Sequence, residues 1–192
     1  MAMKKNSRVF FIITTFVIGL LGTVAYILSQ YTLVDFGISV AYFALLALVS
    51  GTFLWNLRLW MRITGFTNFL PNYLCHSVCT GVVSLALFYI CNYAFAADEG
   101  GYTEKSVVKE KFTKVRHKKP RVSRNRYVPG DAYYVYYVKV KFDNGLDKEF
   151  QVDCTRYRRL HEGDTLMFSV SDGCFGIPVI KYNEVFRHTS VR

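Results

Sequence analysis

Residues 74–97 form an apolar stretch that constrains how the whole chain can fold. The stretch reads LCHSVCTGVVSLALFYICNYAFAA and contains no Lys, Arg, Asp or Glu. A helix needs roughly 20 apolar residues to cross the hydrocarbon core of a bilayer. The sequence therefore predicts a membrane-spanning helix here, and the side on which this helix ends decides where the polar second half of the chain lies.

Two more apolar runs, residues 9–28 and 36–55, precede this stretch. The first run is longer than the roughly 7–15 residues of a signal-peptide core, and no small-x-small cleavage motif follows it, so we expect it to remain as a span. The short connection 29–35 requires the first two helices to form an antiparallel hairpin. Residues 1–97 are thus expected to be a transmembrane region of three helices.

The positive charges of this region predict its orientation. Lys4, Lys5 and Arg8 precede the first run, and Arg58 and Arg62 follow the second. Loops rich in Lys and Arg stay in the cytoplasm, so the N-terminus and the loop 56–73 are expected there. Three crossings then place residues 98–192 outside. In a bacterium the chain would be a multi-pass inner-membrane protein with a periplasmic or exterior domain.

Trp60 lies in the middle of the loop 56–73, with Leu57 and Ile63 at helical spacing around it. This arrangement predicts a short helix along the membrane surface, because aromatic and basic residues favour the interface. We expect membrane lipids to be its first partner.

Residues 98–131 are predicted to be an edge-like strand, residues 104–119, that continues into a basic linker. A dense block of like charge is typical of a mobile loop. Such a loop either binds anionic lipid or glycolipid head groups or is simply solvated. Its cations are Arg116, Lys118, Lys119, Arg121, Arg124 and Arg126.

Residues 132–142 have the clearest strand pattern in the chain. Apolar residues alternate, and the following Asn144-Gly145 pair predicts a type I′ hairpin turn. Residues 146–153 then return, with Lys148, Phe150 and Val152 on one face. The inward face of the first strand is predicted to hold Tyr134, Tyr136, Val138, Val140 and Phe142.

Residues 165–171 and 177–182 are predicted to be further short strands, with Leu166, Phe168 and Val170 facing inward. Short strands separated by Gly and Asp turns indicate a small antiparallel barrel, SH3-like or OB-like, whose main part covers 132–192. A hairpin, then Gly-Asp, then Gly-x-Phe-Gly at 173–176 resembles small barrels appended to bacterial membrane proteins, over about residues 133–182.

The cysteines offer two readings. Cys154 and Cys174 flank neighbouring predicted strands and are a candidate disulfide in an oxidising compartment, or else two separate thiols. Cys75, His76 and Cys79 form C-H-x-x-C, which suits a soft metal only with further ligands. No further ligand is evident, so we expect no metal and no other cofactor.

No catalytic constellation is recognisable, and nucleophile-elbow, P-loop and zinc-protease motifs do not occur, so we do not expect an enzyme. The candidate binding surface combines Tyr133 and Tyr137 with the arginines that follow the hairpin, since aromatic rings and guanidinium groups suit acidic partners. The alternative is that these tyrosines only cover the far side of the barrel. The arginines are Arg156, Arg158 and Arg159.

The net charge of +10 favours an anionic partner. The first hypothesis is a membrane protein whose extracytoplasmic barrel binds a protein partner at the membrane or an anionic envelope component, for example as an immunity or exclusion protein. The alternative is a ligand-gated membrane effector whose basic barrel binds a nucleotide in the cytoplasm. A homo-oligomer fits either hypothesis, whereas nucleic acid is not expected as a partner.

Overall fold

The computed structural model describes residues 5–54, 56–97, 101–118, 121–123, 126–127 and 130–180. Contacts divide the chain into two compact units. The helical unit comprises Met1–Gly100 with Ser171–Val179, and the sheet unit comprises Gly101–Val170 with Ile180–Arg192. The segment 171–179 therefore belongs to the helices, although it is far from them in the sequence.

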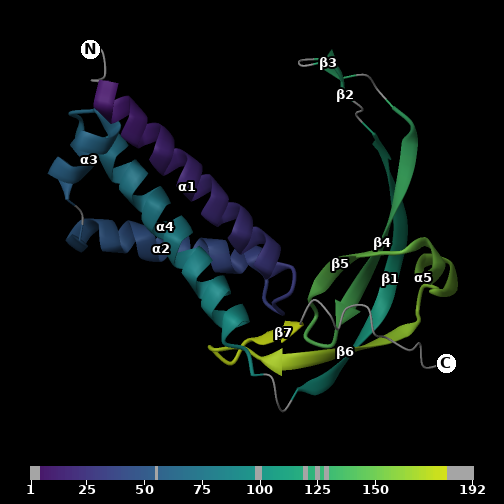
Figure 1. The fold of residues 1–192 in the computed structure, drawn as a ribbon. Coiled ribbons are helices and arrows are strands. Elements are labelled where there is room, and N and C mark those ends of the chain that lie inside the picture. The colour runs from purple at the N-terminus through teal and green to yellow at the C-terminus, as the bar shows by residue number, and fades with distance from the viewer. Residues whose placement is uncertain are drawn as a thin grey trace. The chain divides into compact units, whose positions relative to one another are not determined.

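The helical unit contains four helices, of which two, over Arg8–Ser29 and Phe69–Ala94, are long and apolar enough to cross a membrane. The number rises to three if the second and third helices are counted together as one bent span. The last helix begins five residues before the predicted start, because Pro71 falls in its first turn, where proline is tolerated. The helices are α1 (Lys5–Ser29), α2 (Phe36–Leu54), α3 (Leu57–Thr64) and α4 (Phe69–Ala94) (Figure 1).

α1 and α4 pack side by side and run in the same direction. A β-carbon on Gly22 would lie 3.8 Å from Val82. Further along, the Tyr31 and Tyr93 rings approach to 6.3 Å. Contacts thus advance together along both helices, and the C-terminal ends of α1 and α4 meet at the same end of the unit.

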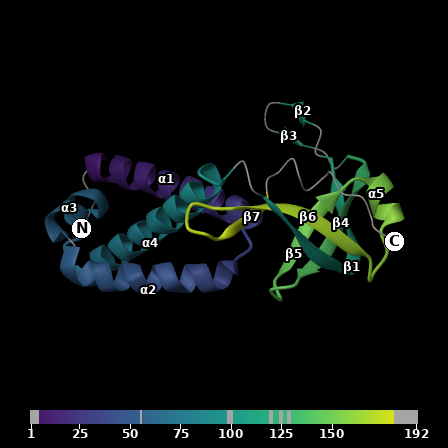
Figure 2. The ribbon, with the colours of Figure 1, turned by 90° about the horizontal axis from the view of Figure 1, so that it is seen from below.

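α2 packs on the same central helix but runs in the opposite direction (Figure 2). Phe36 at its start lies 6.3 Å from Tyr89 near the end of α4. Near its own end, the Leu48 carbonyl accepts a 2.6 Å hydrogen bond from the Tyr73 hydroxyl in the first turns of α4. α2 therefore leads the chain back along α4 to the end at which α1 began.

α3 is the short helix expected around Trp60, and a buried polar network joins it to α4. The Thr64 hydroxyl donates to the Asn72 side-chain oxygen at 2.6 Å. The Asn72 amide nitrogen donates to the carbonyls of Phe66, at 2.9 Å, and Asn68, at 2.7 Å. These bonds satisfy carbonyls in the turn between the helices, so Thr64 and Asn72 can be fully buried without leaving a polar group unpaired.

Asn92, in the last turn of α4, holds the segment 171–179. Its fully buried side chain donates from Nδ2 to the Ile177 carbonyl at 3.1 Å and accepts at Oδ1 from the Phe175 amide at 3.1 Å. A β-carbon on Gly173 would overlap the Asn92 side-chain amide. Any larger residue here would therefore have to displace Asn92 or the turn itself.

Three further contacts dock the same segment on the ends of the helices. The Phe175 ring stacks on Phe88 of α4 with centroids 5.3 Å apart. The Leu33 amide, between α1 and α2, donates to the Pro178 carbonyl at 2.9 Å. The Ala97 amide donates to the Asp172 carbonyl at 3.0 Å. The segment therefore closes the end at which α1 and α4 finish.

The antiparallel sheet has the strand order β5-β4-β1-β6-β7, of which β5, β4, β1 and most of β6 belong to the sheet unit. β1 lies in the middle, so the prediction of an edge-like strand is wrong. Several of the charges that suggested an edge, including Lys109, Lys114 and Arg116, lie on the exposed face of a central strand, whereas Lys111 lies on the other face. The elements are β1 (Tyr102–His117), β2 (Arg121–Ser123), β3 (Arg126–Tyr127), β4 (Ala132–Phe142), β5 (Asp147–Val152), α5 (Cys154–Arg159), β6 (Thr165–Asp172) and β7 (Pro178–Ile180) (Figure 1).

The sheet is curled into a half-barrel around aromatic side chains. Phe168 of β6 lies 5.4 Å from Phe142 of β4 and 5.3 Å from Phe150 of β5. β5 and β6 are separated by two strands, so their inner faces can meet only if the sheet curves. The predicted inward positions are mostly confirmed, since the buried residues include Val138, Val140, Phe142, Lys148, Phe150, Leu166, Phe168 and Val170.

Two details of the sheet differ from the prediction. Tyr134 is 60% exposed, because it lies on β4 beyond the reach of the core. The hairpin turn after Phe142 has three residues instead of two: Phe142 and Leu146 pair, and Gly145 alone has a positive φ, of 84°. This is the common three-residue loop with glycine in the left-handed region, not a type I′ turn.

We predict that Gly173→Ala destabilises the helical unit by about 1–3 kcal/mol, because the added methyl group must displace Asn92 or the turn that it holds. Chemical denaturation of the full chain in mixed micelles measures the change. Gly19→Ala is the matched control, since a β-carbon there meets nothing within 4 Å. Equal unfolding midpoints for the two variants would contradict the prediction.

Candidate binding surface on the β1–β4 hairpin

The longest part of the sheet is the hairpin of β1 and β4, which extends beyond the other strands (Figure 1). β5 pairs only with residues 136–141 of β4, and β6 pairs only with residues 102–107 of β1. Residues 114–118 and 130–135 therefore form a two-stranded extension. We call the face of this hairpin that points away from the core the outer face.

A β-bulge at Lys109 decides which side chains reach the outer face. Val108 pairs with Val140, whereas Glu110 already pairs with Lys139, so one extra residue is inserted in β1. Such a bulge changes the phase of side-chain alternation along the strand. Beyond it, the register places Phe112, Lys114 and Arg116 on the outer face, opposite Tyr137, Val135 and Tyr133. Of these residues Val135 is buried, so the accessible part of the outer face consists of the others.

Aromatic rings and cations alternate closely on the outer face. The Phe112 and Tyr137 rings stack with centroids 5.5 Å apart and planes inclined by 10°. Lys114 Nζ lies 4.7 Å from the centre of the Tyr137 ring and 5.0 Å from that of Phe112. One Arg116 guanidinium nitrogen donates to the Tyr137 hydroxyl at 3.1 Å. The rings therefore hold both cations in defined positions.

Carboxylates of β5 neutralise the part of the outer face that adjoins β5, around Lys109, Lys114 and Lys139. Asp147 accepts from Lys109 Nζ at 2.8 Å and lies 3.6 Å from Lys139 Nζ. Lys114 Nζ lies 3.8 Å from a Glu149 oxygen. Among the residues that the structure describes, no carboxylate pairs with Arg116 or Lys118. Unbalanced positive charge is thus concentrated on the extension.

The helix α5 lies against the opposite face of the same hairpin. The Tyr157 ring contacts that of Tyr136 at 4.9 Å, and Lys111 Nζ lies 4.5 Å above Tyr157. Lys111 also donates to the Leu160 carbonyl at the end of α5. A hydrogen bond with the Cys154 thiol raises the pKa of the Tyr136 phenol. α5 therefore covers the end of the core.

The predicted site residues divide into groups. Tyr133, Tyr137 and Arg116 share the outer face, and Lys118 follows β1 directly. Of the linker, Lys119 and Arg124 lie outside the described residues, and only the backbone of Arg121 and Arg126 is described, in β2 and β3. The remaining candidates, on α5 and hence against the other face, are Arg156, Arg158 and Arg159.

The cysteines do not support the predicted special roles. Cys154 and Cys174 are free thiols, the first in the sheet unit and the second in the helical unit, so the candidate disulfide is not formed. His76 accepts a 3.1 Å hydrogen bond from the Trp60 indole at Nδ1. Within the described parts of the chain, no three His, Cys, Asp or Glu residues are grouped as a metal site would need.

Sequence reasoning missed Phe112 and Lys114 as members of the outer face. Both are in the segment that was interpreted as an edge strand. Their alternation with Arg116 shows that the three residues share a face, but it does not show which strand pairs with them. The signal that could have found them is the i, i+2, i+4 spacing of these three residues.

Comparison of the chain with protein-family models, with curated proteins and with solved structures finds no match. The functional argument therefore depends on the geometry of the chain itself.

We predict that Lys109→Met raises the pKa of the Asp147 carboxyl. The hydrogen bond from Lys109 is the main cause that holds this pKa below its ordinary value. A carboxyl whose pKa is lowered by folding stabilises the folded state above its unfolded pKa of about 3.9, and the contribution disappears as the pH falls through the folded value. NMR titration of the Asp147 carboxyl carbon in the full chain measures the shift.

Lys114→Met is the control for this titration, because Lys114 pairs with Glu149 and not with Asp147. It should leave the titration of Asp147 unchanged. An Asp147 pKa that is the same in Lys109→Met as in the unmodified chain would show that the contact is not formed in solution.

Proposed function

We propose that this chain is an integral membrane protein that crosses the bilayer three times and presents an OB-like module, on the side opposite its N-terminus, to bind an anionic envelope component. The observation that carries the proposal is the parallel packing of α1 and α4. Two parallel spans require the connecting chain to return across the membrane. α2 runs antiparallel to α4, and its 19 residues give a length of about 28 Å.

The distribution of charge supports one orientation. Arg8 near the start of α1 and the exposed Arg58 and Arg62 of α3 lie toward the same end of the unit, because α3 packs against α1 and the first half of α4. Asp35, which caps α2 by accepting from the Ile38 amide at 2.8 Å, lies at the other end. Under the positive-inside rule the cationic end is cytoplasmic, and the chain leaves α4 on the other side.

The order of the strands favours an OB-like module over an SH3-like one. The first strand is long and bulged and lies between two hairpins, and a helix joins the third long strand to the fourth. OB folds are partly open five-stranded Greek-key barrels that bind oligonucleotides and oligosaccharides on their second and third strands and two adjacent loops. Here those strands are β4 and β5. This part of the proposal rests on analogy of fold.

The outer face supplies the chemistry for an anionic saccharide. The Phe112 and Tyr137 rings offer flat apolar contact, and Arg116 offers donors in a geometry that suits carboxylate or phosphate. Residues 118–131, which join β1 to β4, correspond to one of the two loops that OB folds use, and they carry the basic linker. The ligand would therefore lie along β4, the strand that the outer face shares with the OB-type site, towards these residues.

Fusions of alkaline phosphatase and green fluorescent protein test the topology. We expect phosphatase activity for a fusion after residue 192 and fluorescence for a fusion after residue 65, since an odd number of crossings separates the chain ends. Fluorescence after residue 192 would contradict the proposal. The same cations would then face the cytoplasm, as required for a nucleotide-binding effector.

Binding of polygalacturonate, an anionic polysaccharide, tests the surface. The full chain in nanodiscs of neutral lipid should bind it, and Arg116→Gln should weaken binding by about tenfold, the effect of losing one charge-assisted hydrogen bond. Arg159→Gln removes the same charge from α5 and should change binding little. Equal losses in the two variants would show that only net charge matters, and absence of binding would overturn the choice of ligand.

A further inference from the structure

A cavity of about 270 Å³ lies between α1, α3 and α4, near the end of the unit where α1 begins. All three helices contribute to its wall, and the side chains that line it are almost entirely apolar. They include Phe11 and Ile18 of α1, Trp60 and Ile63 of α3, and Val78 and Cys79 of α4.

Three polar groups in the cavity wall, those of Thr15, Trp60 and Thr64, are already hydrogen-bonded within the protein. The Thr15 hydroxyl donates to the Phe11 carbonyl at 2.8 Å. The Thr64 hydroxyl contacts the Trp60 carbonyl and Asn72, and the Trp60 indole donates to His76. A polar occupant would have few partners here, whereas a hydrocarbon chain would leave no polar group unsatisfied.

Cations lie at this end of the unit, and none of them pairs with a carboxylate among the residues that the structure describes. Arg8 precedes Phe11 by one turn, on the side of α1 that carries Phe11 and Thr15 towards the cavity. Arg58 and Arg62 are exposed one turn apart on α3. Residues 1–97 contain a single acidic residue, Asp35, and it lies at the opposite end. These cations are therefore available to an anionic group from the surroundings.

We propose that this cavity holds an acyl chain of an anionic phospholipid from the leaflet that faces the N-terminus, with the lipid phosphate near Arg8, Arg58 and Arg62. Basic sites between transmembrane helices on the cytoplasmic side bind such head groups. The site rests on the proposed insertion of α1 and α4 in the membrane, and it is independent of any ligand of the β1–β4 hairpin.

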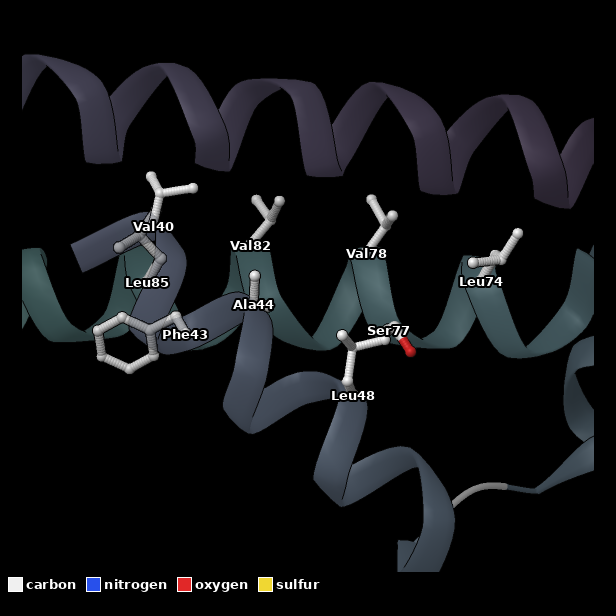
Figure 3. Close-up of a pocket in the computed structure, with 10 residues that line it drawn as sticks. Val40, Phe43, Ala44, Leu48, Leu74, Ser77, Val78, Val82 and Leu85 are labelled. Carbon is white, nitrogen blue, oxygen red and sulfur yellow. The ribbon is translucent and has the colours of Figure 1, made fainter. Parts of the chain in front are cut away.

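A second apolar cavity, of about 290 Å³ between α2 and α4, serves as a comparison. Figure 3 shows Val40, Ala44 and Leu48 of α2 beside Val78 and Val82 of α4. No charged side chain lines either cavity. The first cavity differs because Arg8 precedes Phe11 by one turn and Arg62 adjoins Ile63, whereas no Lys or Arg lies within one turn of the residues that line the second. An anionic lipid would therefore have no reason to prefer the second cavity over a neutral lipid.

Native mass spectrometry of the detergent-solubilised full chain, titrated with phosphatidylglycerol or phosphatidylcholine, tests the site. We expect tighter retention of phosphatidylglycerol, and a loss of about fivefold for each of Arg58→Gln and Arg62→Gln, the effect of one cation at an anionic head group. Cys79→Phe should fill the cavity and remove the tightly held lipid. Ala44→Phe, which fills the second cavity, should retain it.

Equal retention of the two lipids would overturn the proposal, as would phosphatidylglycerol binding that is unchanged in Cys79→Phe. If Cys79→Phe fails to fold, the two arginine variants at the surface decide the matter by themselves. Resistance of the chain to alkaline carbonate extraction is measured in parallel. Extraction of the unmodified chain by carbonate would overturn the membrane assignment. A chain that resists extraction but retains both lipids equally would overturn only the lipid site.

Discussion

The organisation of this chain depends on the hydrogen bonds that the buried side chain of Asn92 makes with the turn at 173–177. An amide that is buried must use its donors and acceptor, and Asn92 does so on a turn more than 80 residues later in the sequence, through Phe175 and Ile177. The absence of a side chain on Gly173 makes this approach feasible. As a result, a segment of the sheet-forming half of the sequence belongs to the helical unit, and the ends of α1 and α4 are closed by protein.

Much of the fold could be predicted because apolar patterning determines it. The three apolar runs became α1, α2 and most of α4, since a helix is the structure that satisfies its own backbone in an apolar medium. Alternation correctly gave the buried face of β6 and of the second half of β4, Val138 to Phe142, whereas in the first half Tyr134 is exposed and Val135 is buried. Such patterns indicate which residues of a segment are buried, and this prediction does not require knowledge of which other segment packs against it.

The rest depends on contacts between distant segments, which alternation alone does not encode. β1 carries the charges of an edge strand, yet it is central because both β4 and β6 pair with it. The candidate surface was predicted in part: Tyr133, Tyr137 and Arg116 share a face, but α5 and its arginines lie against the other one. Only the pairing register could reveal this separation, and the apolar cavity between α1, α3 and α4 likewise has no signature in a single segment.

The bulge at Lys109 also has an evolutionary consequence. Because one inserted residue sets the phase of everything that follows in β1, a regular ladder that kept every residue would display Lys111, Thr113 and Val115 in place of Phe112, Lys114 and Arg116. Deleting the codon for Lys109 has a different result, because Glu110 then still pairs with Lys139 and Phe112 with Tyr137. Related chains with and without this residue should therefore present the same surface to their surroundings, whereas a deletion further along β1 should exchange it.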